Sequence, residues 1–194
     1  MESARRLARI NIAAFEAANV ERIAVNAAGC GAALHEYGAW LASDPEWRDR
    51  GQAIAGRCMD VTELLEEAGP VRGGPVCGTV AYHPPCHLEH AQGVRSAPRA
   101  VLEAIPGLEI RSAERASECC GGAGIYGITH PDLGGRIGAD KARALADTES
   151  DCVATGNPGC MMQIAAFLDD EGSDLDVAHP VELLYESYRR AGLI

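Results

Sequence analysis

The sequence lacks the features that mark membrane, secreted and nucleic-acid-binding proteins. No apolar stretch approaches the roughly 20 residues that span a bilayer, and the first residues, MESARRLARINIAAFE, contain no continuous apolar segment typical of a secretion signal. Basic residues are also few, with 17 Lys and Arg against 28 Asp and Glu, a formal net charge of −11. Such a charge disfavours contact with nucleic-acid phosphates or anionic lipid. We therefore expect a cytoplasmic chain that binds no nucleic acid and has no membrane span, and that meets a membrane only through a complex.

Aromatic residues make up only 5% of the 194 residues, so a core must be built mainly from aliphatic side chains. Eight cysteines are too few for a disulfide scaffold of this length. In a reducing compartment, clustered cysteines more often hold metal or carry out redox chemistry. Other enzyme signatures are missing, because the Gly-rich stretch GGAGIYG lacks a following Lys-Ser/Thr pair and no G-x-S-x-G occurs.

Helix-like and strand-like stretches alternate along the chain. Apolar spacing predicts helices over 2–19, 31–42, 60–69, 96–107, 131–147, 160–172 and 180–192, and strands over 22–27, 78–83, 108–113, 152–156 and 174–180. Asp60, with Glu63 three residues later, predicts a helix start, and His179 precedes Pro180 at another. This order predicts an α/β fold with parallel-sheet layers and flanking helices.

One internal repeat is visible. Residues 23–30 read IAVNAAGC and residues 153–160 read VATGNPGC, and each segment predicts a strand, a turn and the start of a helix. Only the second segment has a long, cysteine-containing part before it. We therefore expect a partial first repeat with connecting helices over 1–72 and a complete second one over 73–194. The alternative is a chance likeness between two stretches rich in Ala and Gly.

Four cysteines follow predicted strands. Cys86 lies in HPPCHL, Cys119 and Cys120 in ECCGGAG, and Cys160 in NPGC. Because the carboxyl ends of parallel strands share one edge of the sheet, we expect these thiols to converge there. Thiolates bind zinc and iron–sulfur clusters, and glycine N–H groups can donate to sulfur. For the adjacent pair, the alternatives are a vicinal disulfide or two unrelated thiols.

The remaining cysteines and the histidines near Cys86 have simpler interpretations. We expect Cys58, Cys77 and Cys152 to be small buried hydrophobic side chains. His83 and His87 flank Cys86 and are interpreted as residues that shape the loop through hydrogen bonds. Metal ligation by either imidazole is the alternative.

The segments HPPCHL, ECCGGAGIY, VATGNPGC and VAHPVELL together resemble the cysteine-rich CCG domain. That domain occurs twice in the iron–sulfur subunit of glycolate oxidase, and also in lactate-utilisation proteins and heterodisulfide reductase. The resemblance is closest to the C-terminal part of the glycolate oxidase subunit. NAAGCGAALHEYG, residues 26–38, resembles the end of its first copy, and residues 78–190 resemble its whole second copy.

The resemblance implies an electron-carrying subunit of a 2-hydroxy-acid oxidoreductase. Carried over residue by residue, Cys86, Cys119, Cys120 and Cys160 would hold an iron–sulfur cluster, and Cys30 would belong to the first copy's site. A flavoprotein partner would oxidise the hydroxy acid, and this chain would pass the electrons onward. The family's ferredoxin-like segment, with its C-x2-C-x2-C-x3-C-P runs, is missing from these residues, which implies either that this chain is a fragment or that another chain supplies the segment.

Asn157 departs from the family pattern, because the motif often ends in C-x-x-C and Asn157 occupies its first position. Four thiolates then suit one [4Fe–4S] cluster better than a five-thiolate cluster. Two alternatives stay open at this point: disulfide reduction of the heterodisulfide reductase type, and a structural zinc site with four thiolates in an interaction module.

Overall fold

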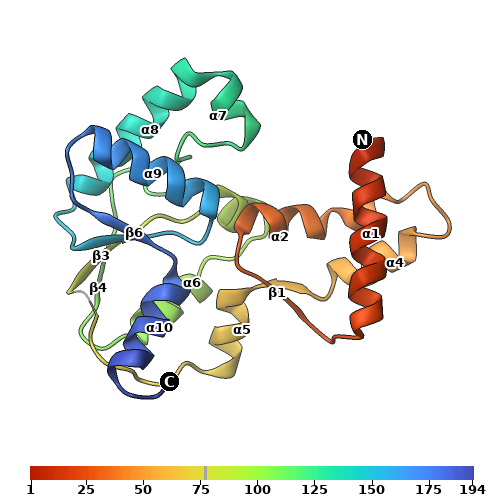
Figure 1. Ribbon diagram of the computed structural model, residues 1–194, viewed down its shortest axis with the longest axis horizontal. Helices are drawn as coiled ribbons and strands as arrows, with labels where there is room; N and C mark the ends of the chain where they lie inside the picture. The colour runs from red at the N-terminus through yellow and green to blue at the C-terminus, as the bar shows by residue number, and fades with distance from the viewer. Residues whose placement is uncertain (77) are drawn as a thin grey trace.

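In the computed structural model, which describes residues 1–76 and 78–194, the second half of the chain forms a four-stranded parallel sheet (Figure 1). Its strands are β3 (Thr79–Tyr82), β4 (Glu109–Arg111), β5 (Cys152–Ala154) and β6 (Asp176–Ala178), in the order β4-β3-β5-β6. In the register, Val80 pairs with Ile110 and Cys152, and Val153 pairs with Val177. The expected parallel α/β architecture is confirmed.

Helices cover both faces of this sheet. Alternate residues of a strand point to opposite faces. Val80 and Tyr82 therefore pack with α6 (Ala97–Glu103) and α10 (Pro180–Arg190), whereas Ala81 and Val153 face α8 (Pro131–Ala146) and α9 (Pro158–Asp170). The second face is lined by small strand residues, which lets α8 and α9 come close to the loops that leave the sheet.

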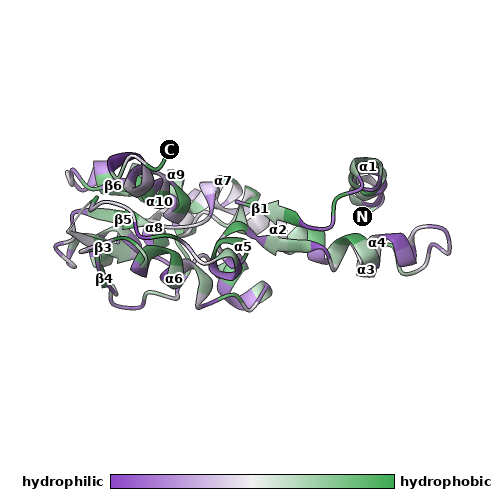
Figure 2. Ribbon diagram, turned by 90° about the horizontal axis from the view of Figure 1, so that it is seen from below, coloured by the Kyte–Doolittle hydropathy of each residue, from purple (hydrophilic) through white to green (hydrophobic). Residues whose placement is uncertain are grey.

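The first half of the chain forms a smaller unit beside the sheet (Figures 1 and 2). Strands β1 (Ile23–Val25) and β2 (Cys58–Asp60) pair in parallel. Helices α1 (Glu2–Ala18), α3 (Tyr37–Trp40) and α4 (Arg48–Ala55) pack together at the end away from the sheet, whereas α2 (Ala28–His35) contacts the second half and α5 (Val61–Ala68) packs on α6. The expected boundary at 72/73 falls in the segment after α5.

Several short elements differ from the sequence expectation. Residues 48–55 and 125–129 are helical, the latter as α7 (Ile125–Thr129), and His87–Ala91 forms the π-helical turn η1. These helices were not predicted because the polar sequence RDRGQAIA of α4 and the glycines around α7 give no regular spacing of apolar residues. The strand β2 was not expected, because its three residues are ordered by a partner strand far away along the chain. Within the described residues, no helix combines the length and apolar character needed to cross a membrane.

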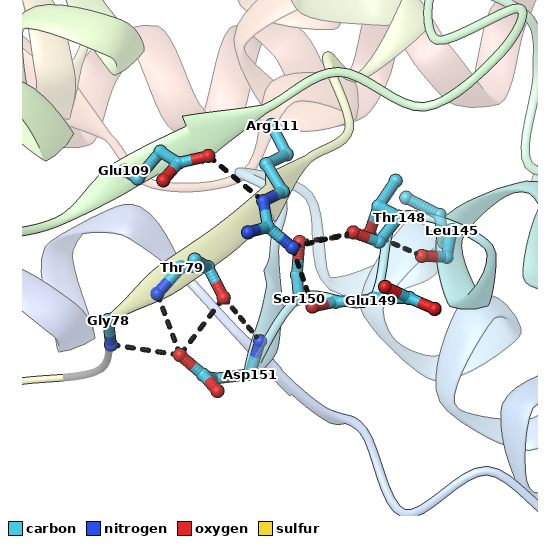
Figure 3. A network of polar contacts seen from close by, with 9 residues as sticks. All are labelled: Gly78, Thr79, Glu109, Arg111, Leu145, Thr148, Glu149, Ser150 and Asp151. Carbon is cyan, nitrogen blue, oxygen red and sulfur yellow. Dashed lines mark hydrogen bonds and ion pairs between the residues drawn. The ribbon is translucent and has the colours of Figure 1, made fainter.

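A polar network fixes the loops at the amino ends of the central strands (Figure 3). The Asp151 carboxylate accepts from the N–H groups of Gly78 and Thr79 at 2.9 and 2.7 Å, and these N–H groups lower the pKa of Asp151. Arg111 donates to the carbonyls of Thr148 and Glu149 at 2.9 and 2.7 Å, just after α8 ends. The register of β3 and β5 is thus anchored at the end opposite the cysteine loops.

Both expected helix starts are present. Asp60 accepts from the Thr62 N–H at 2.9 Å and Glu63 bonds back to the Asp60 N–H, which makes a capping box for α5. His179 does the same for α10, accepting from the Val181 N–H through Nδ1 at 3.1 Å. Cys58 and Cys152 are both 7% exposed, as expected for buried hydrophobic thiols, and Cys77 lies outside the described residues.

The His179 cap makes stability depend on pH. Burial lowers the pKa of His179, and a protonated Nδ1 could no longer accept from Val181. Its stabilising contribution is therefore complete above the unfolded pKa of about 6.5 and is lost as pH falls below it. We expect the free-energy advantage of wild type over His179→Asn, which caps without titrating, to shrink on acidification by up to about 1.4 kcal/mol per pH unit. Urea denaturation of both proteins from pH 7.5 to 5 measures this, and parallel pH profiles would contradict it.

Candidate metal centre

The four cysteines come from three loops at the carboxyl edge of the sheet. Cys86 follows β3 at the start of η1, Cys119 and Cys120 follow β4, and Cys160 lies in the first turn of α9 after β5. Together with Gly29, Asn157 and the glycine-rich loop, they line one cleft of about 690 Å³. The four thiols therefore converge as expected, because the three loops follow three parallel strands that end at the same edge of the sheet.

The four thiols form a chain of electrostatically coupled groups. The neighbouring thiols of Cys120 and Cys86 lower the pKa of Cys119, and the Cys120 thiol lowers that of Cys160. The pKa values of Cys86 and Cys120 are raised, first by proton sharing with Cys119 and then by burial. A cation with soft-ligand preference would replace the protons, because thiolates are the metal-binding form.

His83 lies deepest in the site. It is the first residue after β3, it is 1% exposed, and its ligand atom lies within 4.8 Å of the sulfurs of Cys120 and Cys160. Neither ring nitrogen has a well-aligned hydrogen-bond partner among the described residues, but the imidazole interacts with the Cys160 thiol and helps to lower its pKa. Our interpretation of His83 as a residue that shapes the loop through hydrogen bonds stays a prediction, and metal ligation stays its alternative. The ligand atoms of His83, Cys120 and Cys160 lie close enough together to hold a metal ion.

The glycine-rich loop brings backbone close to the sulfurs. Gly121 has φ +85° and its N–H donates to the Cys119 Sγ at 3.3 Å. A Cβ on Gly121 would meet the carbonyl of Gly134 in α8 at 2.4 Å, so only glycine fits between the loop and this helix. The backbone N–H donor expected of this loop is thus present at Cys119.

Two other residues near the cleft have distinct surroundings. Cys30 is exposed, whereas its neighbour Gly29 lines the cleft. His87 is also exposed, and its Nδ1 lies 3.7 Å from the Cys86 sulfur. The exposed side chains of Ile125 and Ile128 line the cleft and make its outer side apolar.

The donor set fits a thiolate-bound metal group. Four thiols line a single cleft, and the buried imidazole of His83 lies within 4.8 Å of the sulfurs of Cys120 and Cys160. Thiolates with imidazole suit zinc or iron–sulfur clusters, whereas hard cations prefer oxygen ligands. A vicinal disulfide between Cys119 and Cys120 is absent from the structure, in which both are free thiols.

Comparison with known proteins agrees with this arrangement. The cysteine-rich domain family CCG matches residues 1–35 and 80–165, and the chain therefore belongs to this family. It is similar to the probable glycolate oxidase iron-sulfur subunit of Bacillus subtilis strain 168, with 36% identity over 188 residues, 94% of this chain and 42% of that protein. The glycolate oxidase iron-sulfur subunit of Escherichia coli K12 is 31% identical over 175 residues, 89% of this chain and 41% of that protein.

The chain thus spans less than half the length of the glycolate oxidase subunits it matches. Lactate utilization protein A of Oceanobacillus iheyensis is 27% identical over 195 residues, 100% of this chain and 79% of that protein. The family match leaves out residues 36–79, which include most of the helices at the far end of the first half. The two matched segments carry the repeated strand–turn–helix units and the cysteine loops.

Proposed function

We propose that this chain is the iron–sulfur part of a 2-hydroxy-acid oxidoreductase, with a cluster held by Cys86, Cys119, Cys120 and Cys160. The observation that carries the proposal is the convergence of four thiols on one cleft at a single edge of the sheet, with a buried histidine beside two of them. Its relatives named as iron-sulfur subunits of glycolate oxidase support the same conclusion. The bound cluster would supply one-electron redox chemistry.

The residues of the chain have separate tasks in this proposal. The four thiols would bind the irons, and their number suits one [4Fe–4S] cluster. The N–H of Gly121, which donates to Cys119, would stabilise negative charge on the sulfur. The buried inner wall around His83 keeps water away from Cys120 and Cys160, which are 2% and 4% exposed.

The electron donor would be a flavoprotein subunit that oxidises glycolate or a related 2-hydroxy acid, and a ferredoxin-like iron–sulfur segment on another chain would accompany it. We further propose that residues 1–72 are the end of a first CCG copy and 73–194 the second copy. The match in two separate segments, and the strand–turn–helix units β1–α2 and β5–α9, support this division. The proposed location is the cytoplasm, with any membrane association made through the complex.

Metal and acid-labile sulfide analysis of protein purified without oxygen, with a visible spectrum, tests this proposal. We expect iron and sulfide in equal amounts, about four of each per chain, with broad visible absorbance. The same analysis is repeated after reconstitution with iron and sulfide, because clusters are easily lost. One equivalent of zinc without sulfide would replace the proposal by the structural zinc site. No metal after reconstitution would reject both the iron–sulfur cluster and the zinc site.

Turnover of a heterodisulfide is the corresponding test of the second activity known in the family. We expect none, because Asn157 occupies the place of a fifth thiol and donates a hydrogen bond to Cys160 instead. Reduction of a heterodisulfide by the cluster-loaded chain, at a rate above that of the metal-free chain, would overturn this expectation.

His83 gives a prediction in which stability and metal binding change in opposite directions. Replacing it by leucine removes a buried polar group without a well-aligned hydrogen-bond partner, and also its interaction with the Cys160 thiol, so we expect the metal-free protein to gain only about 1 kcal/mol. The same change removes the imidazole beside Cys120 and Cys160, two of the residues that would hold the cluster, and we expect iron to be lost to a chelator about tenfold faster. Urea denaturation and iron-release kinetics measure the two effects.

The matched control for His83→Leu is His35→Leu, because His35 is an exposed histidine at the end of α2. It should leave the iron-release rate as in wild type. If His83→Leu destabilised the metal-free protein and left iron release unchanged, His83 would be an ordinary core residue.

A further inference from the structure

Asn157 is placed where an asparagine normally caps its own helix. It precedes Pro158, the first residue of α9, and its backbone is extended as at a typical N-cap. Such an asparagine usually accepts a hydrogen bond from one of the first N–H groups of that helix. Within the described residues, the Asn157 side chain makes no such bond to α9. Its two polar atoms are therefore available for other partners.

The Asn157 oxygen caps α2 instead. Its Oδ1 accepts the Gly29 N–H at 3.2 Å, and beside it the Gly156 carbonyl accepts the Ala28 N–H at 3.2 Å. The residue at the N-cap of α2 is Ala27, which has no side-chain acceptor. Two of the first N–H groups of α2 are thus satisfied by a loop that lies 128 residues further along the chain.

The Asn157 nitrogen contacts the proposed metal centre. Its Nδ2 donates to the Cys160 Sγ at 3.3 Å, and this donor helps to lower the pKa of Cys160. Asn157 is half-buried and Gly29 lines the cysteine cleft, so the link lies at the wall of the site. One side chain therefore connects the start of α2, in the first half, to a sulfur of the second half.

The two repeated segments use this position differently. With the offset of 130 between them, Ala27 corresponds to Asn157 and Cys30 to Cys160. Because Ala27 has no side-chain amide, it cannot make the corresponding contacts. The side-chain hydrogen bond between the two segments therefore comes from Asn157 alone. The amide at position 157 thus creates a contact between the halves that the repeat itself does not require.

We propose that Asn157 is a positioning residue that caps α2 from across the repeat boundary and, through its N–H on Cys160, raises the reduction potential of the bound cluster. This inference rests on the proposed function. A donated N–H stabilises the more negative, reduced state of a thiolate-bound cluster, so its removal lowers the potential. The docking of α2 keeps the amide in the orientation that donates to sulfur.

Two variants separate the two bonds. Asn157→Ala removes both, whereas Asn157→Asp keeps an acceptor for Gly29 and replaces the N–H donor by negative charge. In metal-free protein, we expect hydrogen exchange of the Gly29 amide, followed by NMR, to become at least about tenfold faster in Asn157→Ala and to stay near wild type in Asn157→Asp. In cluster-loaded protein, we expect the potential to fall in both, by about tenfold in the reduction equilibrium or about 59 mV.

Gln52→Ala is the matched control, since Gln52 is an exposed amide in α4. It should change neither measurement. If wild type holds a cluster and Asn157→Ala leaves its potential unchanged, the tuning role is rejected, and unchanged Gly29 exchange rejects the cap. If wild type holds no cluster after reconstitution, the proposed function fails and the tuning role with it, while Gly29 exchange still decides the cap.

Discussion

Replacing Cys120 by serine is expected to abolish cluster binding, with at least about a tenfold loss of iron per chain. Cys120 is 2% exposed, and its thiol lowers the pKa of both Cys119 and Cys160, so it lies between these two cysteines in the site. A serine hydroxyl is a hard oxygen donor and a poor substitute for thiolate towards iron–sulfur clusters. Iron and sulfide content after anaerobic reconstitution, with the visible spectrum, measures the effect.

Cys58→Ser is the matched control for this substitution. Cys58 is buried as well, at 7% exposure, but it belongs to the core of the first half and its thiol donates to the Ile54 carbonyl at 3.3 Å. Serine can keep that hydrogen bond, so we expect full iron content. Circular dichroism of the metal-free proteins confirms that both fold. Wild-type iron content in Cys120→Ser would remove Cys120 from the ligand set.

The meeting of the four cysteines could be predicted because it depends on topology alone. Each motif follows a strand-like stretch, and parallel strands end at one edge whatever their order in the sheet. The sequence also indicated the helix starts at Asp60 and His179, since capping is a local interaction between residues three positions apart.

The roles of His83 and Asn157 could not be predicted in the same way. The position of His83 directly after a strand was a signal, but its closeness to Cys120 and Cys160 depends on how the Gly-rich loop and α9 pack beside that strand. Asn157 was visible only as a departure from C-x-x-C. Its partner Gly29 lies on a helix of the first half, and no local pattern reports a contact across 128 residues.

Replacing Gly121 by alanine is expected to lower the free energy of unfolding by about 2–4 kcal/mol and to displace Cys120. The φ of +85° is strained for alanine, and the new Cβ would lie 2.4 Å from the Gly134 carbonyl and 2.9 Å from the Gly138 nitrogen. Helix α8 cannot move away easily, because Gly138 itself packs so closely on Phe167 of α9 that a Cβ there would lie 2.4 Å from the ring. The loop must shift instead, together with its thiols.

Gly172→Ala separates the contact from the backbone strain. Gly172 has φ +72°, yet a Cβ there would meet nothing within 4 Å, so only the backbone cost of about 1 kcal/mol remains. Urea denaturation gives the stability difference, and iron content shows whether the sulfurs are still aligned. Equal losses of stability in the two variants would mean that φ alone matters. A larger loss for Gly121→Ala, with lower iron content, would mean that the close approach of the Gly-rich loop to α8 is what holds Cys119 and Cys120 in the site.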